Sequence, residues 1–459
     1  MNSRILFKKL FSADIASNYE NLNKLMRQIP NSYIEKKTAI TFLSGSAGEL
    51  DWVLPILDYL SKKNFNINIV FLTRHARASV EKNSMLKNYI SQKNIQPEVH
   101  LCGGYLAEKI ERLGYLAHRA AIKLKLQNKP AIKLFHSLLN KIFKKIFFLG
   151  LPLKILNLQE QKCLFFSEYP SLRRPRDQWL KEKFHNSLFF YCPHSPHIYA
   201  EDLGIQYQDV QVKNINSRSF LLLGHPADYL VLNDGGELSD PDLEKVFIGH
   251  PKYSNSWLHD CREKSKKFRI SLSTRNKINI LVLSRGSGSY LNKDYHTELA
   301  DSVVGTISEQ IENYNLFIKK HPREEDVYWD SLVDKYSSIS IIDNHIYDIA
   351  SSVDFVISFW SSGAMDCHAM GVPVIELFDP NRYTKQQFLD GENYTTIYRK
   401  LGVVFPANNK KDLEEVIENL IENNFDVKLG KPHPLYSDLI ERSNDWQITL
   451  DKILSVNSF

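Results

Sequence analysis

Short, continuous runs of apolar residues recur along the chain, and each leads into a turn rich in glycine, serine or charged residues. The run at 38–43 (TAITFL) is followed by a small-residue turn at 44–48. Leucine and valine then recur at helical spacing from Leu50 to Leu60, before a second apolar run at 67–72 (INIVFL). Strand, glycine turn, helix and strand form a βαβ unit, which predicts a parallel sheet covered on both faces.

The same alternation predicts two series of strands. The first series continues at 163–167, 188–192, 228–232 and 246–248, and the second runs through 278–283, 315–319, 339–342, 354–358 and 372–377. A polar, highly charged stretch at 254–277 interrupts the alternation, and we place the linker between two domains there. Each series is of the length that a Rossmann-like domain needs.

The 459 residues exceed the roughly 250–300 residues that one hydrophobic core supports. We therefore predict an α/β fold in which two Rossmann-like domains face each other across a central cleft. The expected parts are a helical lead-in at 1–36, an N-terminal domain at 37–255, a C-terminal domain at 256–435 and a C-terminal helix at 436–459.

Charge and cysteine content narrow the class of protein. The net charge of +5 is too mild to indicate a nucleic-acid partner. The five cysteines are scattered and form no C-x-x-C pair, which argues against a disulfide framework or a zinc site and for a reducing compartment. The chain shows neither a signal peptide nor an apolar stretch of the ~18–20 residues that span a bilayer, so we expect a cytoplasmic protein.

One segment differs from the rest by its charge. No acidic residue occurs between Glu111 and Glu160, whereas eight lysines lie there among leucine, isoleucine and phenylalanine. Basic amphipathic helices of this kind bind anionic lipid, so the segment at 112–159 is a candidate for peripheral contact with the inner membrane face. A pair of ordinary surface helices is the alternative.

Candidate site residues follow the predicted strands, because ligands of open parallel sheets bind beyond the carboxyl ends of the strands. Lys320, His321, Pro322 and Arg323 come directly after the strand at 315–319. The histidine and arginine have donors for a nucleotide phosphate or base, although a solvated, charged turn would have the same composition.

Two further loops of the second domain have the composition of anion sites. Ser361, Ser362, Gly363 and Asp366 follow the strand at 354–358, where hydroxyls and amides at a helix start favour phosphate. Ser361 is placed as the N-cap, and capping alone would explain it.

The first strand of the second domain is followed by Ser284, Arg285, Gly286 and Ser287. This loop has the flexibility to wrap a pyrophosphate, but it lacks the spacing of a P-loop. A plain connection between strand and helix is equally compatible with it.

The first domain offers candidates for a general base. Glu49, Asp51, Glu168 and His194 all follow predicted strands, and a carboxylate or histidine can deprotonate an acceptor hydroxyl. Glu49 and Asp51 have an alternative role in capping the helix that begins beside them.

The paired domains resemble the GT-B superfamily, in the branch of the nonhydrolysing UDP-N-acetylglucosamine 2-epimerases and the CDP-glycerol glycerophosphotransferases. The segment 228–231 (DYLV), followed by 246–251 (VFIGHP), is similar to the strands that close the first domain in that branch. His321-Pro322 and Ser361-Ser362 resemble a motif pair of bacterial sialyltransferases and Kdo transferases. By that resemblance, His321 contacts a cytidine nucleotide, and Ser361 and Ser362 hold its phosphate.

The resemblance implies a transferase of polysaccharide biosynthesis at the cell envelope. It would move a sugar, or a glycerophosphate-like group, from a CMP- or CDP-linked donor to a glycan or lipid-linked acceptor. The C-terminal domain would hold the donor and the N-terminal domain the acceptor, with neither a metal nor a cofactor. The alternatives are a UDP-sugar 2-epimerase, a UDP-sugar glycosyltransferase and a non-catalytic protein of polysaccharide assembly.

Overall fold

The structure is a computed structural model. It describes residues 37–91, 98–101, 161–168, 180–192, 217–224, 243–272, 277–286, 291–321, 324, 327–382, 388–390 and 393–459 except 428 and 431, with a few single positions between 109 and 158. The predicted lead-in at 1–36 and the predicted strand at 228–232 lie outside these residues.

The first sheet has seven parallel strands in the order β3-β2-β1-β4-β5-β6-β7. They are β1 (Thr38–Leu43), β2 (Asn66–Phe71), β3 (Glu98–Leu101), β4 (Cys163–Ser167), β5 (Leu188–Tyr191), β6 (Ser219–Leu223) and β7 (Leu243–Phe247). The predictions for β1, β2, β4 and β5 are confirmed, and β7 begins three residues before the predicted start. β3 and β6 were not predicted from the sequence.

The second sheet has six parallel strands in the order β10-β9-β8-β11-β12-β15. They are β8 (Ile278–Leu283), β9 (Tyr314–Lys319), β10 (Ile339–Ile341), β11 (Phe355–Ser358), β12 (Val374–Leu377) and β15 (Phe405–Ala407). All five predicted strands are confirmed, whereas β15 was missed. The short antiparallel pair β13 (Phe388–Asp390) and β14 (Asn393–Thr395) forms a separate sheet.

Both sheets share one order of strand addition. Each chain segment begins in the middle of its sheet, adds two strands on one side, and then returns to continue on the other side. The order therefore reverses between β1 and β4 in the first sheet and between β8 and β11 in the second. Ligands of doubly wound sheets bind where the loops diverge at such a reversal, so these two points are where a site is expected.

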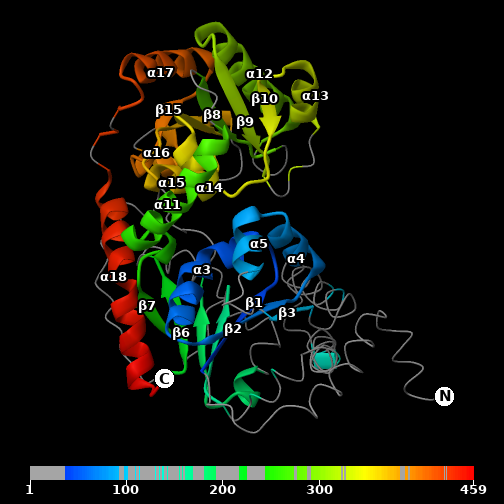
Figure 1. Cartoon of the computed structure of the whole chain (residues 1–459), viewed down its shortest axis with the longest axis vertical. Helices are drawn as coiled ribbons and strands as arrows, with labels where there is room; N and C mark the ends of the chain where they lie inside the picture. The colour runs from blue at the N-terminus through cyan, green and yellow to red at the C-terminus, as the bar shows by residue number, and fades with distance from the viewer. Residues whose placement is uncertain are drawn as a thin grey trace, which may run out of the picture.

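Helices cover the sheets and join the domains (Figure 1). They are α3 (Ala47–Lys62), α4 (Arg74–Glu81), α5 (Ser84–Ser91), α11 (Asn255–Leu272), α12 (Lys293–Gln310), α13 (Tyr328–Lys335), α14 (Ile346–Ile349), α15 (Gly363–Ala369), α16 (Ile397–Lys400), α17 (Lys410–Glu422) and α18 (Pro434–Val456), with 3-10 turns η3 (Pro251–Tyr253), η4 (Ala350–Ser352) and η5 (Pro380–Arg382). The periodicity from Leu50 to Leu60 is confirmed as the buried face of α3.

The polar stretch at 254–277, which we predicted to be the linker between the domains, is a helix for most of its length. It forms α11, and Trp257, Leu258 and Cys261 are its buried apolar side chains among the described ones. Lysine and arginine on the remaining faces concealed this narrow apolar stripe in the sequence. The helix leads from η3 of the first domain to the second domain and packs against α14 and η4.

The predicted C-terminal helix is confirmed as α18, which returns from the second domain along the side of the first (Figure 1). The Trp446 ring packs edge-on against Tyr59 of α3 at 5.2 Å. The hydroxyl of Ser443 accepts the His250 amide at 2.9 Å. One buried apolar cluster includes residues of both sheets and of α18, so the two domains share a packed junction.

Candidate active site

Two contacts bring the carboxyl ends of both sheets together. Asp51 lies on the second turn of α3, directly after β1, and His345 lies between β10 and α14. His345 Nε2 is 2.9 Å from Asp51 Oδ1. Ser84 Oγ donates to Asp348 Oδ2 at 2.8 Å beside them. The loops that follow the strands of the two sheets therefore face one another across the domain junction.

The loops after β8 and β11 meet at the reversal point of the second sheet. Arg285 donates a hydrogen bond to the carbonyl oxygen of Trp360, and its guanidinium lies 5.1 Å from the centre of the Trp360 ring. Trp360 has a positive φ of 54°, an uncommon conformation for an aromatic residue. The arginine thus fixes a strained turn directly before the serine pair, and its half-buried side chain stays at the carboxyl edge.

Glu324 ties the loop after β9 to the loop after β8. Its Oε1 accepts the Ser284 hydroxyl at 2.9 Å, and its Oε2 accepts the His321 amide at 3.1 Å. Gly286 has a φ of +69°, and a Cβ built on it would lie 2.4 Å from Cγ of Glu324. Only glycine meets both conditions, since side chains disfavour this φ and the space is filled.

The structure assigns Ser284 a role inside the domain and corrects its prediction as a nucleotide contact. The side chain is 2% exposed and also accepts a hydrogen bond from Trp329 Nε1 at 2.9 Å. Its Oγ lies 3.1 Å from His296 Nε2, and its amide bonds to the Lys319 carbonyl. Hydroxyl and amide are therefore both used to hold loops together.

The serine pair lies at the carboxyl end of β11. Helix α15 begins at Gly363, with Ser362 rather than Ser361 at the N-cap position, one residue later than predicted. The Ser361 hydroxyl still accepts the Gly363 amide at 3.3 Å. Ser361 is half-buried and Ser362 is exposed, so both lie at the surface of this edge.

The His-Pro turn and the serine pair lie at the same edge of one sheet. His321 follows β9 and Ser361 follows β11, and β8 lies between these strands. Two strand spacings amount to about 10 Å, the size of a nucleotide diphosphate group with its ribose. Lys320 beside them pairs with Asp330 at 2.6 Å. Ser287, Pro322 and Arg323 lie outside the described residues.

The structure separates Asp366 from the predicted phosphate site. Its side chain is 10% exposed, and Oδ1 lies 3.0 Å from Lys252 Nζ and accepts the Tyr253 hydroxyl at 3.0 Å. A carboxylate would also repel a phosphate. Asp366 therefore belongs to the domain junction.

Three of the candidate bases in the first domain differ in their surroundings. Glu49 is 6% exposed and accepts the amides of Ser44, at 2.7 Å, and of Gly45, so it fixes the loop after β1. Glu168 is half-buried directly after β4, at the reversal point of the first sheet. His194 lies outside the described residues.

Asp51 is held as a carboxylate by the Lys252 ammonium and by its contact with His345. Burial raises the pKa of Asp51, but Lys252 and His345 together lower it by more. The pKa therefore falls well below the ordinary value of an aspartate. Burial raises the pKa of Asp366 more than Lys252 lowers it. A general base works best with a pKa near the working pH, so the surroundings of Asp51 do not suit it to that role.

Several residues of the site were not found in the sequence. Lys252 and His345 both contact Asp51 at the junction between the domains, yet neither belongs to a motif that can be recognised from spacing alone. Arg74 and His75 are exposed directly after Thr73, at the carboxyl edge of the first sheet beyond β2. The rule that strand ends carry the site, applied to 67–72, would have found these two.

Two kinds of feature are absent from the described ranges. No group of three His, Cys, Asp or Glu side chains in this part of the chain could hold a metal ion. None of the helices described is long and apolar enough to cross a membrane.

Known proteins resemble the chain in structure. No family model and no curated protein matches its sequence. A structure of a variant of the wall teichoic acid polymerase TagF with CDPG has a TM-score of 0.50 at 11% identity, covering 98% of this chain and 99% of that one. The UDP-GlcNAc 2-epimerase of Neisseria meningitidis bound to UDP-GlcNAc has a TM-score of 0.49 at 13% identity, covering 91% and 100%. The enzyme of Methanocaldococcus jannaschii in complex with UDP-GlcNAc and UDP has a TM-score of 0.47 at 14% identity, covering 90% and 99%.

This chain has the GT-B fold. The similarity to TagF extends over nearly the full length of both chains, and the two parallel sheets agree with it. At this level of identity the comparison establishes the fold, and the chemistry has to be argued from the site itself.

Proposed function

We propose that the protein is a transferase that moves a sugar, or a glycerophosphate-like group, from a nucleotide-activated donor to a glycan or lipid-linked acceptor. The observation that carries this proposal is the linkage of three loops at the reversal point of the second sheet. Arg285, His321 and the Ser361–Ser362 pair follow β8, β9 and β11, and Arg285 and Glu324 join their loops.

These groups suit an activated phosphate. Arg285 and Lys320 carry positive charge, His321 has a ring donor, and the serine hydroxyls and nearby amides add hydrogen bonds. In the transferase, the bond between the transferred carbon or phosphorus and the donor phosphate oxygen breaks, and the leaving phosphate gains charge. Fixed donors stabilise that charge without reorganisation. We propose that this requires no metal, and we favour a CMP or CDP donor.

The acceptor would lie against the first domain. Among its candidates, Glu168 is half-buried directly after β4, at the reversal point of the first sheet, where ligands of doubly wound sheets bind. We propose that Glu168, or His194, takes the proton of the acceptor hydroxyl. Arg74 and His75 beyond β2 would face an anionic acceptor.

The reaction type is tested by incubating the protein with CDP-glycerol, a CMP-activated sugar and UDP-GlcNAc, each with and without EDTA, and recording ³¹P and ¹H NMR spectra. We expect slow release of CMP from CDP-glycerol or from the CMP-activated sugar by transfer to water, undiminished by EDTA and lost in His321→Ala. Interconversion of UDP-GlcNAc without nucleotide release would instead identify a 2-epimerase. UDP release would identify a UDP-sugar transferase, and no turnover with any donor would favour a non-catalytic protein.

We also propose that the protein works at an anionic membrane through the segment 112–159. Most of this segment lies outside the described residues, but Leu134, Leu138 and Ile142 are described as helical and are 73%, 55% and 40% exposed. They recur every four residues, the spacing at which residues of a helix lie on one side. The lack of acidic residues in the segment matches an anionic lipid surface and would bring the enzyme to a lipid-linked acceptor.

A further inference from the structure

A buried lysine occupies the junction between the domains. Lys252 belongs to η3, the turn that joins β7 to α11, and its side chain is 2% exposed. Its Nζ lies 2.7 Å from Asp51 Oδ2 on α3 and 3.0 Å from Asp366 Oδ1 on α15. Lysine is almost never buried unless it is paired, because its ammonium loses its hydration. The two carboxylates come from different domains, so one ammonium connects both.

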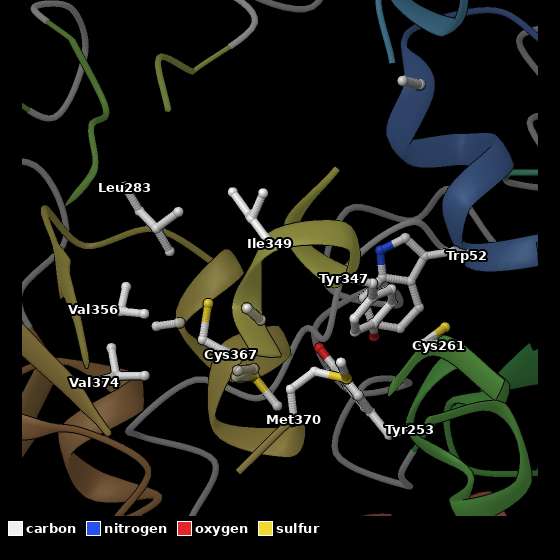
Figure 2. Close-up of a cluster of buried hydrophobic side chains, with 14 of the residues drawn as sticks. Trp52, Tyr253, Cys261, Leu283, Tyr347, Ile349, Val356, Cys367, Met370 and Val374 are labelled. Atoms are coloured by element: carbon white, nitrogen blue, oxygen red, sulfur yellow. The ribbon is translucent and has the colours of Figure 1, made fainter. Parts of the chain in front are cut away.

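Three aromatic rings enclose the same ammonium. Lys252 Nζ lies 4.6 Å from the ring centre of Trp52 and 5.6 Å from those of Tyr253 and Tyr347. Figure 2 shows Trp52 on α3 beside Tyr347, with Tyr253 below them. The Tyr347 hydroxyl also donates to the Lys252 carbonyl at 3.2 Å. Ring faces attract a cation most strongly where water is excluded.

Each carboxylate is itself oriented by a further group. The Tyr347 amide donates to His345 Nδ1 at 3.2 Å, which leaves Nε2 as the protonated nitrogen that donates to Asp51. The Tyr253 hydroxyl donates to Asp366 Oδ1 at 3.0 Å. The positions of both carboxylates are thus set from two sides, and the ammonium fixes the distance between them.

We infer that Lys252 is a positioning residue that sets the donor half of the site against the acceptor half. On the donor side, Asp366 lies on α15, which begins at Gly363 beside the serine pair. On the acceptor side, Asp51 lies two residues beyond Glu49, which holds the loop after β1. The functional meaning rests on the proposed transferase, whereas the positioning itself is a property of the folded protein.

The arrangement explains why an ion is kept in an apolar junction. Well-packed apolar side chains stabilise a core at least as well as a buried ion pair, but they pack in more than one way. An ammonium between two carboxylates at opposite sides has one favourable position. We therefore expect loss of the ion to affect the relative placement of α3 and α15 more than the folding of either domain.

The test compares three forms of the full chain without any ligand. Lys252→Met alone leaves two carboxylates without their cation and is expected to fold poorly. The informative variant, called the charge-free variant below, therefore combines Lys252→Met with Asp51→Asn and Asp366→Asn. Its amide oxygens still accept hydrogen bonds from His345 and Tyr253. The control combines Lys63→Met with Asp451→Asn and removes an exposed pair, 2.6 Å apart, between the residue that follows α3 and helix α18.

Hydrogen exchange by mass spectrometry provides the readout. In the charge-free variant we expect the amides at the start of α3 and in α14 and α15 to exchange at least about tenfold faster, while those of the sheets keep their protection. The control should match the wild type. Unchanged exchange of α3, α14 and α15 in a folded charge-free variant would overturn the inference.

A second measurement separates this inference from the proposed function. Nucleotide affinity should change by less than about threefold in the charge-free variant, because the candidate nucleotide contacts all lie in the second domain, while turnover should fall at least about tenfold. Equal loss of affinity and turnover would contradict a positioning role. If the wild type binds no nucleotide, the proposed function fails, and the exchange result still decides the role of Lys252.

Discussion

The surroundings of Asp51 indicate a structural role at the domain junction, where it pairs with Lys252 and His345. It was a candidate base because it follows a strand, but Lys252 and His345 hold its pKa well below the ordinary value of an aspartate. Its folded-state pKa lies below its unfolded value, so its contribution to stability is present above about pH 4 and declines as the pH falls towards the folded-state pKa.

This pKa gives a pH-dependent prediction. We expect Asp51→Asn to destabilise the protein by about 3 kcal/mol at pH 7, because it removes one partner of a buried ion pair. As the pH falls from about 4.5 to about 2.5 the wild type should lose more stability than the variant, so that the difference shrinks. Denaturant unfolding at several pH values measures it. A difference that stays constant over this range would contradict the lowered pKa of Asp51. Lys252, His345 and Asp366 are the groups that face its carboxylate.

At the scale of single helices, α18 links the C-terminus to the first domain. Trp446 is 2% exposed and packs on Tyr59, whereas Ile448 on the same helix is 70% exposed. Trp446→Ala should lower the free energy of unfolding by about 3–5 kcal/mol, because it leaves a cavity between α18 and α3. Ile448→Ala should change it by less than about 0.5 kcal/mol. Equal effects of the two changes in denaturant unfolding would contradict the packing described.

Helices and strands were predicted well where the local pattern was strong. Burial on both faces gives a strand a continuous apolar run, as in β1, β8 and β11. Burial on one face gives a helix its apolar period, as in α3, so both patterns are visible in the sequence. β6 follows from the same rule and was overlooked, and β15 is short, at three residues. The helix α11 was hidden because charged residues dominate its composition.

The sequence showed which residues of the candidate site follow a strand, but not which partners they have in the folded protein. His321, Ser361 and Arg285 were found because they follow strands. The roles of Ser284, Glu324 and Asp366 depend on partners that are distant in the sequence and lie in other elements. These partners are Trp329, Gly286 and Lys252, which no local pattern shows. The junction is therefore a property of the tertiary structure.

For the molecule as a whole, the basic segment predicts where the protein works. We expect the wild type to co-sediment with vesicles containing phosphatidylglycerol, but not with pure phosphatidylcholine, and to be released in about 1 M salt, where the Debye length is about 3 Å. Replacing Leu134, Leu138 and Ile142 by glutamine should weaken binding, because the apolar contact is lost. Ile448→Gln is the control, since Ile448 is 70% exposed on α18, outside the basic segment. Binding that is independent of lipid charge, or unaffected by the triple change, would contradict the proposal.

The central claim is that a nucleotide binds where the loops after β8, β9 and β11 meet. Thermal unfolding with CMP, CDP, UDP or GDP tests it most directly, in the wild type, in His321→Ala and in a control, Asp354→Asn. The Asp354 carboxylate accepts the Asn279 amide at 2.8 Å at the opposite edge of the same sheet. We predict that saturating CMP or CDP raises the Tm of the wild type and of the control by about 3–6 °C and leaves that of His321→Ala unchanged. No shift with any of the four nucleotides, or an equal shift in His321→Ala, would contradict the account.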